Sequence, residues 1–382
     1  MRFFKSGSAS TALSILAATV ASTVTLGQAL PAAAAGSSDY RPAITEAVLE
    51  NQATGGILSG DSPESKMADE FANRGVRAFT AGDKETAFGH WEQAMVLYRS
   101  AGDLAGEGRM LENLSVIHRM NDEATEALAL SQQALALYQE LGNAQNQPSL
   151  YLNLGSAYRL AGQYPQAIDA YSTGLSIYQR YADDAGARIM LSLIAQSYTD
   201  QGDFTSSIDF QKQALQIAEK LGNREAEAEA LSELGFAHVM TDKPAEAVGY
   251  LRPALALFKR IGDRPQEVAT LNNLGRAAAL NEDYDLALES YRQARVIFQQ
   301  MNRPAQEAHL LVNMGQAQVG AGELDDAISS FQQAVDITEE IRRQQPHEMQ
   351  LPPRLEAAYR NLATLLEQQN RDEEAREVLR MI

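Results

Sequence analysis

The side chains of this sequence that could do acid–base or metal chemistry are its five histidines, at His90, His118, His238, His309 and His347. A catalytic or metal site needs such groups at a short, fixed spacing, and no HExxH motif, phosphate-binding loop or GxSxG motif occurs. The chain has no cysteine, so it has no thiol nucleophile, thiolate ligand or disulfide. We therefore expect no enzyme activity, no metal and no cofactor.

A column of asparagines is the strongest candidate for binding. A carboxamide has both a donor and an acceptor, so a row of them can pair with the backbone of an extended peptide whatever its sequence. The asparagine column consists of Asn73, Asn113, Asn153, Asn273, Asn313 and Asn361, with Leu193 and Glu233 at the two remaining positions. Two interpretations stay open: each Asn bonds a neighbouring helix and stabilises the stack, or the column contacts a ligand.

Residues beside the asparagine column would give such a site its specificity. One hydrogen bond contributes only ~0.5 to 1.5 kcal/mol net, and association costs several kcal/mol, so the amides alone cannot select a partner. The candidate side chains are Arg109, Arg119, Arg159, Phe236 and Arg276, with Glu112, Glu229 and Glu233 between them. The arginines predict an acidic side chain on the ligand. The break at Leu193 and Glu233 either divides the site in two or is sequence drift.

The asparagine column belongs to a repeat of forty residues. Its best-defined position, the small column, holds Gly75, Ser115, Gly155, Ala195, Gly235, Gly275 and Gly315. Further small residues recur 12 and 19 positions later, from Ala87 and Ala94 onward. An eighth copy, aligned at Ala363, follows after 48 residues. The additional residues lie in RRQQPHEMQLPPR, whose prolines predict a loop.

Each repeat has the pattern of two antiparallel helices. Tyr151, Leu154, Gly155 and Tyr158 form an i, i+3, i+4, i+7 stripe, and a second stripe begins at Ala167 after the turn AGQYPQ. Small residues in both helices let the backbones approach closely. The repeats close at Gly102, Gly142, Gly222 and Gly262, or at Ala182 and Asn302, where a helix end favours a left-handed residue.

This pattern, seen in YLNLGSAYRLAGQYPQAIDAY over residues 151–171, resembles the tetratricopeptide repeat. The resemblance covers residues 67–382, and the forty-residue unit is similar to the longer variant of kinesin light chains and bacterial regulatory proteins. It implies an all-α, right-handed superhelical solenoid of about eight helix pairs. It also implies that the first helix of each pair lines a concave groove, where Asn at this position of related repeats binds peptide backbone.

Two features of related proteins are not expected here. Some related domains bind a C-terminal carboxylate with a fixed set of Lys and Asn, but Ala72, Val76, Glu112 and Val116 stand at the corresponding positions. The segment after residue 341 resembles the stretch that leads into a caspase-like domain in bacterial tetratricopeptide proteins. That domain requires a cysteine, which this sequence lacks, so we expect it to be absent.

The first 35 residues have the three-part pattern of a secretory signal. Arg2 and Lys5 precede an apolar run over residues 12–26, and small residues follow up to Ala34 and Ala35, the two candidate cleavage points. A retained anchor is the alternative, but the run is shorter than the ~20 residues that a spanning helix needs. We expect export to the periplasm or the medium, or to the thylakoid lumen in a photosynthetic bacterium.

The predicted organisation after the signal (1–35) is a flexible Gly/Ser/Pro-rich lead (36–66), seven repeats (67–341), a Pro-rich loop (342–354) and an eighth helix pair (355–382). Without its signal the chain would carry 30 basic and 50 acidic residues, a net charge of −20. Such a charge disfavours nucleic acid and anionic lipid as partners.

The expected function is that of an exported, non-catalytic scaffold. It would bind an extended peptide segment of a protein partner in its concave groove, as an adaptor or assembly factor. The alternative is a structural subunit that self-associates or bridges envelope complexes through its convex face. The oligomeric state is open.

Overall fold

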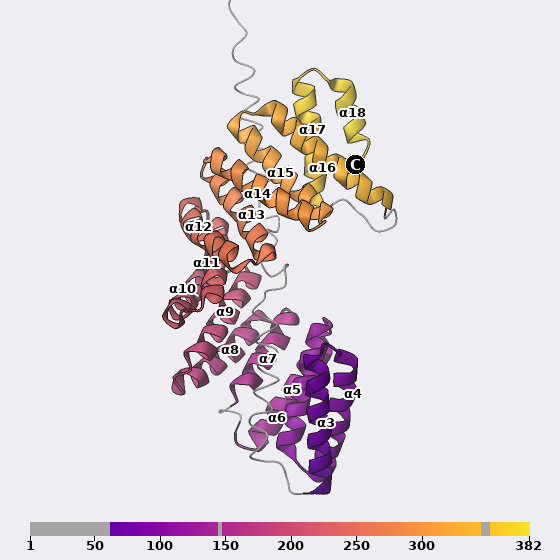
Figure 1. Ribbon diagram of the computed structural model, residues 1–382, viewed down its shortest axis with the longest axis vertical. Helices are drawn as coiled ribbons and strands as arrows, with labels where there is room; N and C mark the ends of the chain where they lie inside the picture. The colour runs from indigo at the N-terminus through magenta and orange to yellow at the C-terminus, as the bar shows by residue number, and fades with distance from the viewer. Residues whose placement is uncertain (1–61, 144–146, 345–351) are drawn as a thin grey trace, which may run out of the picture. The chain divides into compact units, whose positions relative to one another are not determined.

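The computed structural model describes residues 62–143, 147–344 and 352–382, which form sixteen α-helices and no strand (Figure 1). The first helices of the pairs are α3 (Pro63–Thr80), α5 (Leu104–Met120), α7 (Pro148–Leu160), α9 (Asp184–Gln201), α11 (Arg224–Met240), α13 (Arg264–Leu280), α15 (Pro304–Ala321) and α17 (Pro353–Gln368). The second helices are α4 (Lys84–Ala101), α6 (Ala124–Glu140), α8 (Tyr164–Arg180), α10 (Phe204–Leu221), α12 (Pro244–Ile261), α14 (Tyr284–Gln300), α16 (Leu324–Gln344) and α18 (Asp372–Leu379). The predicted all-α solenoid of eight helix pairs is confirmed.

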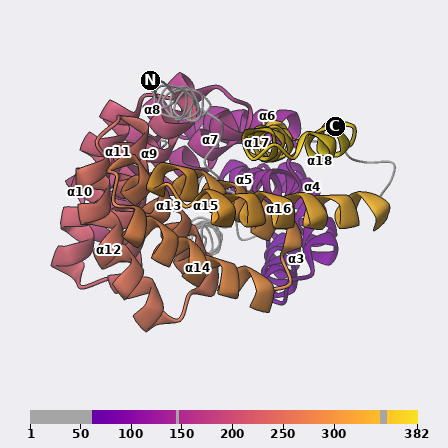
Figure 2. The same cartoon turned by 90° about the horizontal axis from the view of Figure 1, so that it is seen from above.

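The described helices form two compact units that divide within α11. The N-terminal unit, residues 62–230, holds α3 to α10 and the start of α11, and the C-terminal unit, residues 231–382, holds the rest. Within each unit, helices contact their chain neighbours, and first helices also touch one another, as α5 touches α7 and α15 touches α17. Figure 2 shows α13 and α15 side by side in the C-terminal unit, with α14 next to them. This stacking places the first helices in a row, one repeat apart.

The helix ends differ slightly from the predicted boundaries. The signal (1–35) and most of the lead (36–61) lie outside the described residues, as do residues 345–351 of the Pro-rich loop. Helix α3 begins at Pro63, inside the predicted lead, because the Ser62 side chain accepts a hydrogen bond from the Ser65 N–H and caps the helix. Helix α16 continues to Gln344, and α17 already begins at Pro353, so the helices enter the predicted loop from both sides.

The small column lets a large side chain of the second helix lie directly on the backbone of the first. A Cβ atom added at Gly155 would be 2.6 Å from Cε1 of Tyr171, and one at Gly275 would be 2.5 Å from Cε1 of Tyr291. Three further glycines meet their partners in the same way: Gly75 meets Trp91, Gly235 meets Leu251 and Gly315 meets Phe331. All five partners are buried and stand sixteen residues after their glycine. In these five repeats the first helix must therefore carry glycine.

Among the seven repeats spaced by forty residues, the two without glycine also lack a ring or Leu at the partner position. Ser115 lies opposite Ser131, with their hydroxyl oxygens 2.7 Å apart, and it donates to the carbonyl oxygen of Ala127 at 2.8 Å. Ala195 is followed sixteen residues later by Gln211. Because large and small side chains change together, the two helices can keep a close approach in every repeat.

A left-handed residue ends the helices at intervals of twenty residues. Gly102, Gly142, Gly222 and Gly262 have φ between 67° and 84°, as predicted, and Ala182 and Asn302 take the same conformation. The structure adds a second series at the end of the first helices: Gly82, Asp122, Gly162, Gly202, Asp242, Glu282, Gly322 and Asn370. Sequence analysis missed this series, in which four positions are glycine and the others are Asp, Glu or Asn; Asp and Asn also tolerate this conformation.

The next residue in these turns often caps the following helix. The Asp103 side chain accepts a hydrogen bond from the Gly106 N–H at 2.8 Å, and its own N–H donates to the carbonyl oxygen of Tyr98 at 2.9 Å. Asp183 accepts a bond from the Gly186 N–H in the same way. One residue thus ends a helix and starts the next, which keeps the linkers short and the stacking regular.

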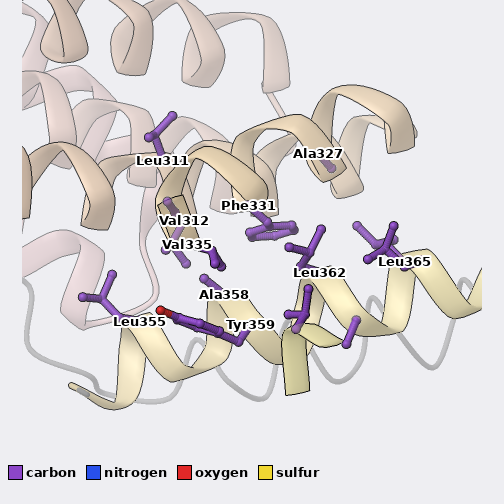
Figure 3. Packing of buried hydrophobic residues seen from close by; sticks show 14 of the residues in the cluster. Leu311, Val312, Ala327, Phe331, Val335, Leu355, Ala358, Tyr359, Leu362 and Leu365 are labelled. Atoms are coloured by element: carbon purple, nitrogen blue, oxygen red, sulfur yellow. The ribbon is translucent and has the colours of Figure 1, made fainter. Parts of the chain in front are cut away.

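The last two helix pairs share one apolar core (Figure 3). Phe331 and Val335 of α16 pack against Leu355 and Leu362 of α17, and all four are at most 2% exposed. The Tyr359 hydroxyl reaches the edge of this core and donates to Glu339 Oε1 at 2.7 Å. The eighth pair is therefore a packed part of the solenoid despite its displaced register.

Replacing Gly155 by Ala tests the close approach of the paired helices. The new Cβ would overlap the Tyr171 ring, so we expect the free energy of unfolding to fall by ~1 to 3 kcal/mol. The matched control is Gly89→Ala within α4, where a Cβ meets nothing within 4 Å. Because Ala has the higher helix propensity, the control should be neutral or stabilising by up to ~1 kcal/mol. Urea unfolding followed by circular dichroism measures both, and equal midpoints would contradict the packing argument.

Candidate functional site

All the predicted binding residues lie on first helices, but they divide between the two units. The N-terminal unit carries Asn73, Arg109, Asn113, Arg119, Asn153 and Arg159 on α3, α5 and α7. The C-terminal unit carries Phe236, Asn273, Arg276, Asn313 and Asn361 on α11, α13, α15 and α17. The repeat places these residues on equivalent turns of neighbouring helices, and we describe each unit by itself.

Asn153 joins α5 to α7 through a buried hydrogen-bond network. Its Nδ2 donates to Glu112 Oε2 at 3.2 Å, and its Oδ1 accepts from Arg119 Nη2 at 3.1 Å. Asn153 and Glu112 are fully buried, and Arg119 is 6% exposed. At this position the amide bridges two oppositely charged side chains of the preceding repeat, which supports the interpretation that Asn stabilises the stack.

Arg109 and Tyr138 border the same network. The Arg109 guanidinium lies 5.6 Å from the centre of the Tyr98 ring, within range of a cation–π interaction. Burial, and then the charge of Glu112 and a hydrogen bond to it, raise the pKa of Tyr138 well above its usual value. Glu112 therefore interacts with Tyr138 as well as Asn153, so the charges of α5 have structural roles.

The other N-terminal candidates differ from Asn153 in their surroundings. Asn73 is exposed on α3, whereas Asn113 is 1% exposed, and its buried Oδ1 accepts no hydrogen bond. Arg159 donates from Nε to Asp200 Oδ2 at 2.6 Å and so forms an ion pair with α9. Among the candidate asparagines of this unit, Asn113 is thus the one with a buried oxygen that accepts no hydrogen bond within the protein.

The asparagines of the C-terminal unit show the same division. Asn313 donates from Nδ2 to Asn272 Oδ1 at 3.1 Å and links α15 to α13. Asn273 is buried, and Asn361 is half-buried with an Nδ2 that is buried and has no acceptor. Phe236 is 6% exposed. The column therefore combines amides that bridge helices with amides that have an unused group.

Arg276 is the charged candidate of this unit. Its Nη2 lies 3.8 Å from the Met240 sulfur, a weak acceptor, and its Nη1 is buried without an acceptor. Burial, and then the nearby charge of Arg354, lower the pKa of Arg276. Sequence analysis missed Arg354 as its neighbour, because this residue belongs to no repeating column and a search for such columns cannot find it.

No part of the chain that the structure describes shows a group of three or more His, Asp or Glu residues able to hold a metal ion. In the same residues, no helix has the length and apolar character required to span a bilayer. The candidate site is thus a set of amides and cations on helix faces.

The sequence matches a family model described as the tetratricopeptide repeat in five overlapping windows, over residues 106–180, 146–220, 186–260, 226–300 and 266–340. A second model of the same description matches residues 312–382. The chain belongs to the tetratricopeptide repeat family. No protein of curated function matches the sequence.

Solved structures with the same fold come from several kinds of protein. The apo form of the quorum sensor NprR from B. thuringiensis is 15% identical, with a TM-score of 0.61 over 90% of this chain and 97% of that one. A signal transduction ATPase with a tetratricopeptide repeat sensor, from Pyrococcus horikoshii, is 14% identical, with a TM-score of 0.62 over 88% of this chain and 51% of that one. A putative kinesin light chain from Podosopora anserina is 21% identical, with a TM-score of 0.46 over 51% of this chain and 96% of that one. At these identities the likeness is one of fold.

Asn153→Ala tests the bridging role of the buried amide. The change removes the donor to Glu112 and the acceptor for Arg119, so we expect a loss of ~1 to 3 kcal/mol in the free energy of unfolding. Asn73→Ala, at the equivalent but exposed position of α3, should stay within ~0.5 kcal/mol of the wild type. Chemical unfolding of both variants provides the comparison, and equal stabilities would exclude the bridge.

Proposed function

We propose that this protein is an exported, non-catalytic scaffold that binds an extended segment of a protein partner along its first helices. The observation that carries the proposal is the unused hydrogen-bonding capacity of the asparagine column. Asn113 Oδ1 is an acceptor without a donor, and Asn361 Nδ2 is a donor without an acceptor. Leaving such groups buried and unpaired is unfavourable, so we propose that binding shifts the neighbouring side chains and lets a ligand supply the missing partners.

An extended peptide backbone has the required chemistry, because every residue other than proline offers one N–H and one carbonyl oxygen. First helices pack on the order of 10 Å apart. An extended strand rises about 3.3 Å per residue, so it would meet one column position roughly every three residues. The proposed binding surface is the row of first helices within each unit, where Asn153 links α5 to α7 in the N-terminal unit and Asn313 links α13 to α15 in the C-terminal unit.

The net charge of −18 supports a protein partner over nucleic acid, since a phosphate backbone would be repelled. Export rests on the signal-like pattern of residues 1–35, with the periplasm, the medium or the thylakoid lumen as the destination. We assign the protein the role of adaptor or assembly factor on the basis of its family rather than of any motif. Family membership supports protein–protein interaction as the general class of function.

Capture experiments with the chain from residue 36 onward test this proposal. The double variant Asn113→Ala/Asn361→Ala should lose the partner from the exported fraction, because two hydrogen bonds correspond to about a tenfold or greater loss of affinity. Asn121→Ala removes an exposed amide at the end of α5 and should retain the partner. Circular dichroism should show equal helical content in all three proteins. Equal capture by the double variant and the control would refute the binding role of the column.

The second candidate function is self-association or bridging through the end of the solenoid. Leu379, Met381 and Ile382 follow one another at the end of α18 and are 41 to 44% exposed. Such side chains favour contact with another apolar surface. Size-exclusion chromatography with light scattering separates the two functions: a mass that rises with concentration supports this one, whereas a monomer at all concentrations counts against it.

A further inference from the structure

The second helices of the C-terminal unit differ in charge at two neighbouring positions of the repeat. The side chains at these positions are basic in α12, neutral in α14 and acidic in α16. The first position holds Lys259, Gln299 and Glu339, and the second holds Arg260, Gln300 and Glu340. The whole helices follow the same order, with three basic and one acidic residue in α12, two of each in α14, and two basic and five acidic residues in α16.

The N-terminal unit shows no such gradient, because its two positions run in opposite directions. The first position changes from Arg99 to Glu219, whereas the second changes from Glu140 to Lys220. The charges at the two positions therefore oppose each other there, and they reinforce each other only in the C-terminal unit.

Side-chain hydrogen bonds show that α12, α14 and α16 are neighbours. Lys259 Nζ of α12 donates to Gln293 Oε1 of α14 at 2.8 Å, and Arg295 Nη2 of α14 donates to Gln333 Oε1 of α16 at 2.7 Å. Because the repeat places equivalent residues at similar heights on successive helices, the graded positions form two rows across the three helices.

The charged groups of these rows are available to a partner. Arg260 is exposed and makes no hydrogen bond or ion pair with any residue that the structure describes. The Glu340 side chain is 55% exposed and pairs at 2.9 Å with Arg343 on its own helix, and Lys259 bonds only the neutral amide of Gln293. Exposed contacts of this kind contribute little to stability, so these side chains can turn to another partner.

Val296 lies in the middle of this surface. It precedes Gln300 by four residues on α14, so the two side chains are on the same face of the helix. Val296 is 51% exposed. A single exposed valine is common on protein surfaces, but this one stands between a basic and an acidic helix, as an apolar centre does within a charged rim.

This surface is complementary to itself. A two-fold axis parallel to α14 brings α12 of one copy against α16 of the other and α14 against its own equivalent, without changing the height along the helices. Arg260 then lies opposite Glu340 of the partner subunit, and Lys259 lies opposite Glu339 of the partner subunit. Val296 packs against Val296 of the partner subunit at the axis.

We propose that α12, α14 and α16 bind a second copy of this chain about such a two-fold axis. The occupant follows from the charges, because each basic row meets an acidic row at two symmetric points. The contact buries few side chains, so the dimer is weak. Every residue involved lies on a second helix, so the dimer is independent of the peptide binding proposed above. It also assigns self-association to a surface other than the end of α18.

Sedimentation equilibrium of residues 36–382, at concentrations up to about 1 mM, detects weak dimers. We expect monomers and dimers but no larger species, because a two-fold contact closes at two copies. Arg260→Glu places like charges opposite each other at two points, so the dissociation constant should rise at least about tenfold. The matched control is Arg180→Glu, at the equivalent exposed position of α8 in the N-terminal unit, which should leave the constant unchanged.

A charge exchange between copies tests the pairing itself. Glu340→Arg should weaken the dimer as Arg260→Glu does, whereas an equimolar mixture of the two variants pairs opposite charges at both points and should dimerise like the wild type. Glu340 is chosen over Glu339 because Glu339 accepts the hydrogen bond of Tyr359 at the edge of the core. Circular dichroism should show the same helical content in all variants.

Each outcome supports or overturns the dimer. A wild-type chain that stays monomeric throughout overturns it, and so does a dissociation constant that is the same in Arg260→Glu and in the control. Species larger than a dimer, or a mixture that does not recover, overturn the two-fold pairing. A dimer lost in Leu379→Ser but kept in Arg260→Glu would place self-association at the end of α18. Partner capture through the asparagine column uses none of these residues, so its failure is separate.

Discussion

The close approach of the two helices in each pair is the constraint on which the rest of the structure depends. A ring of Trp, Tyr or Phe, or a Leu, lies on the bare backbone of a glycine in five repeats, with no room for even one methyl group. The contact occurs at Gly75 and Gly155 in the N-terminal unit and every forty residues from Gly235 to Gly315 in the C-terminal unit. Because it fixes the spacing within each pair, it also fixes which residues of the first helix remain available for other contacts.

The first helices carry asparagines that bridge helices and asparagines with an unused group. The two kinds have the same spacing in the sequence, so spacing alone does not distinguish them. Asn153 and Asn313 bond side chains of the neighbouring first helix, and these bonds hold consecutive repeats in register. Asn113 and Asn361 stand in the same column with a buried group unused. A column built in this way combines rigidity with binding capacity, because the bridging amides hold the helices that present the unpaired ones.

The same division applies to the charges. Arg119 and Glu112 interact through Asn153, and Arg159 pairs with Asp200, so these predicted ligand contacts have partners within the fold. Arg276 instead lies near another basic group, Arg354, and its buried Nη1 lacks an acceptor. A charged side chain is stabilised by water or by an oppositely charged partner. When it is buried without either, the free energy of the unbound protein is higher. Sites that bind a ligand often retain such unfavourable groups, since the ligand supplies the interaction partner that the folded protein lacks.

The sequence by itself determined the fold. The repeat length, the small columns and the glycines after each repeat are local patterns, and each of them recurs several times along the chain. It also determined the family, and it placed every candidate side chain on a first helix. Only the tertiary structure decided which of those side chains already have partners. Asn113 and Asn153 occupy the same position in the repeat, and they differ because Glu112 and Arg119 surround one and not the other. Arg354, whose charge acts on Arg276, lies 78 residues further along the chain and belongs to no repeating column, so no periodic pattern could reveal this neighbour.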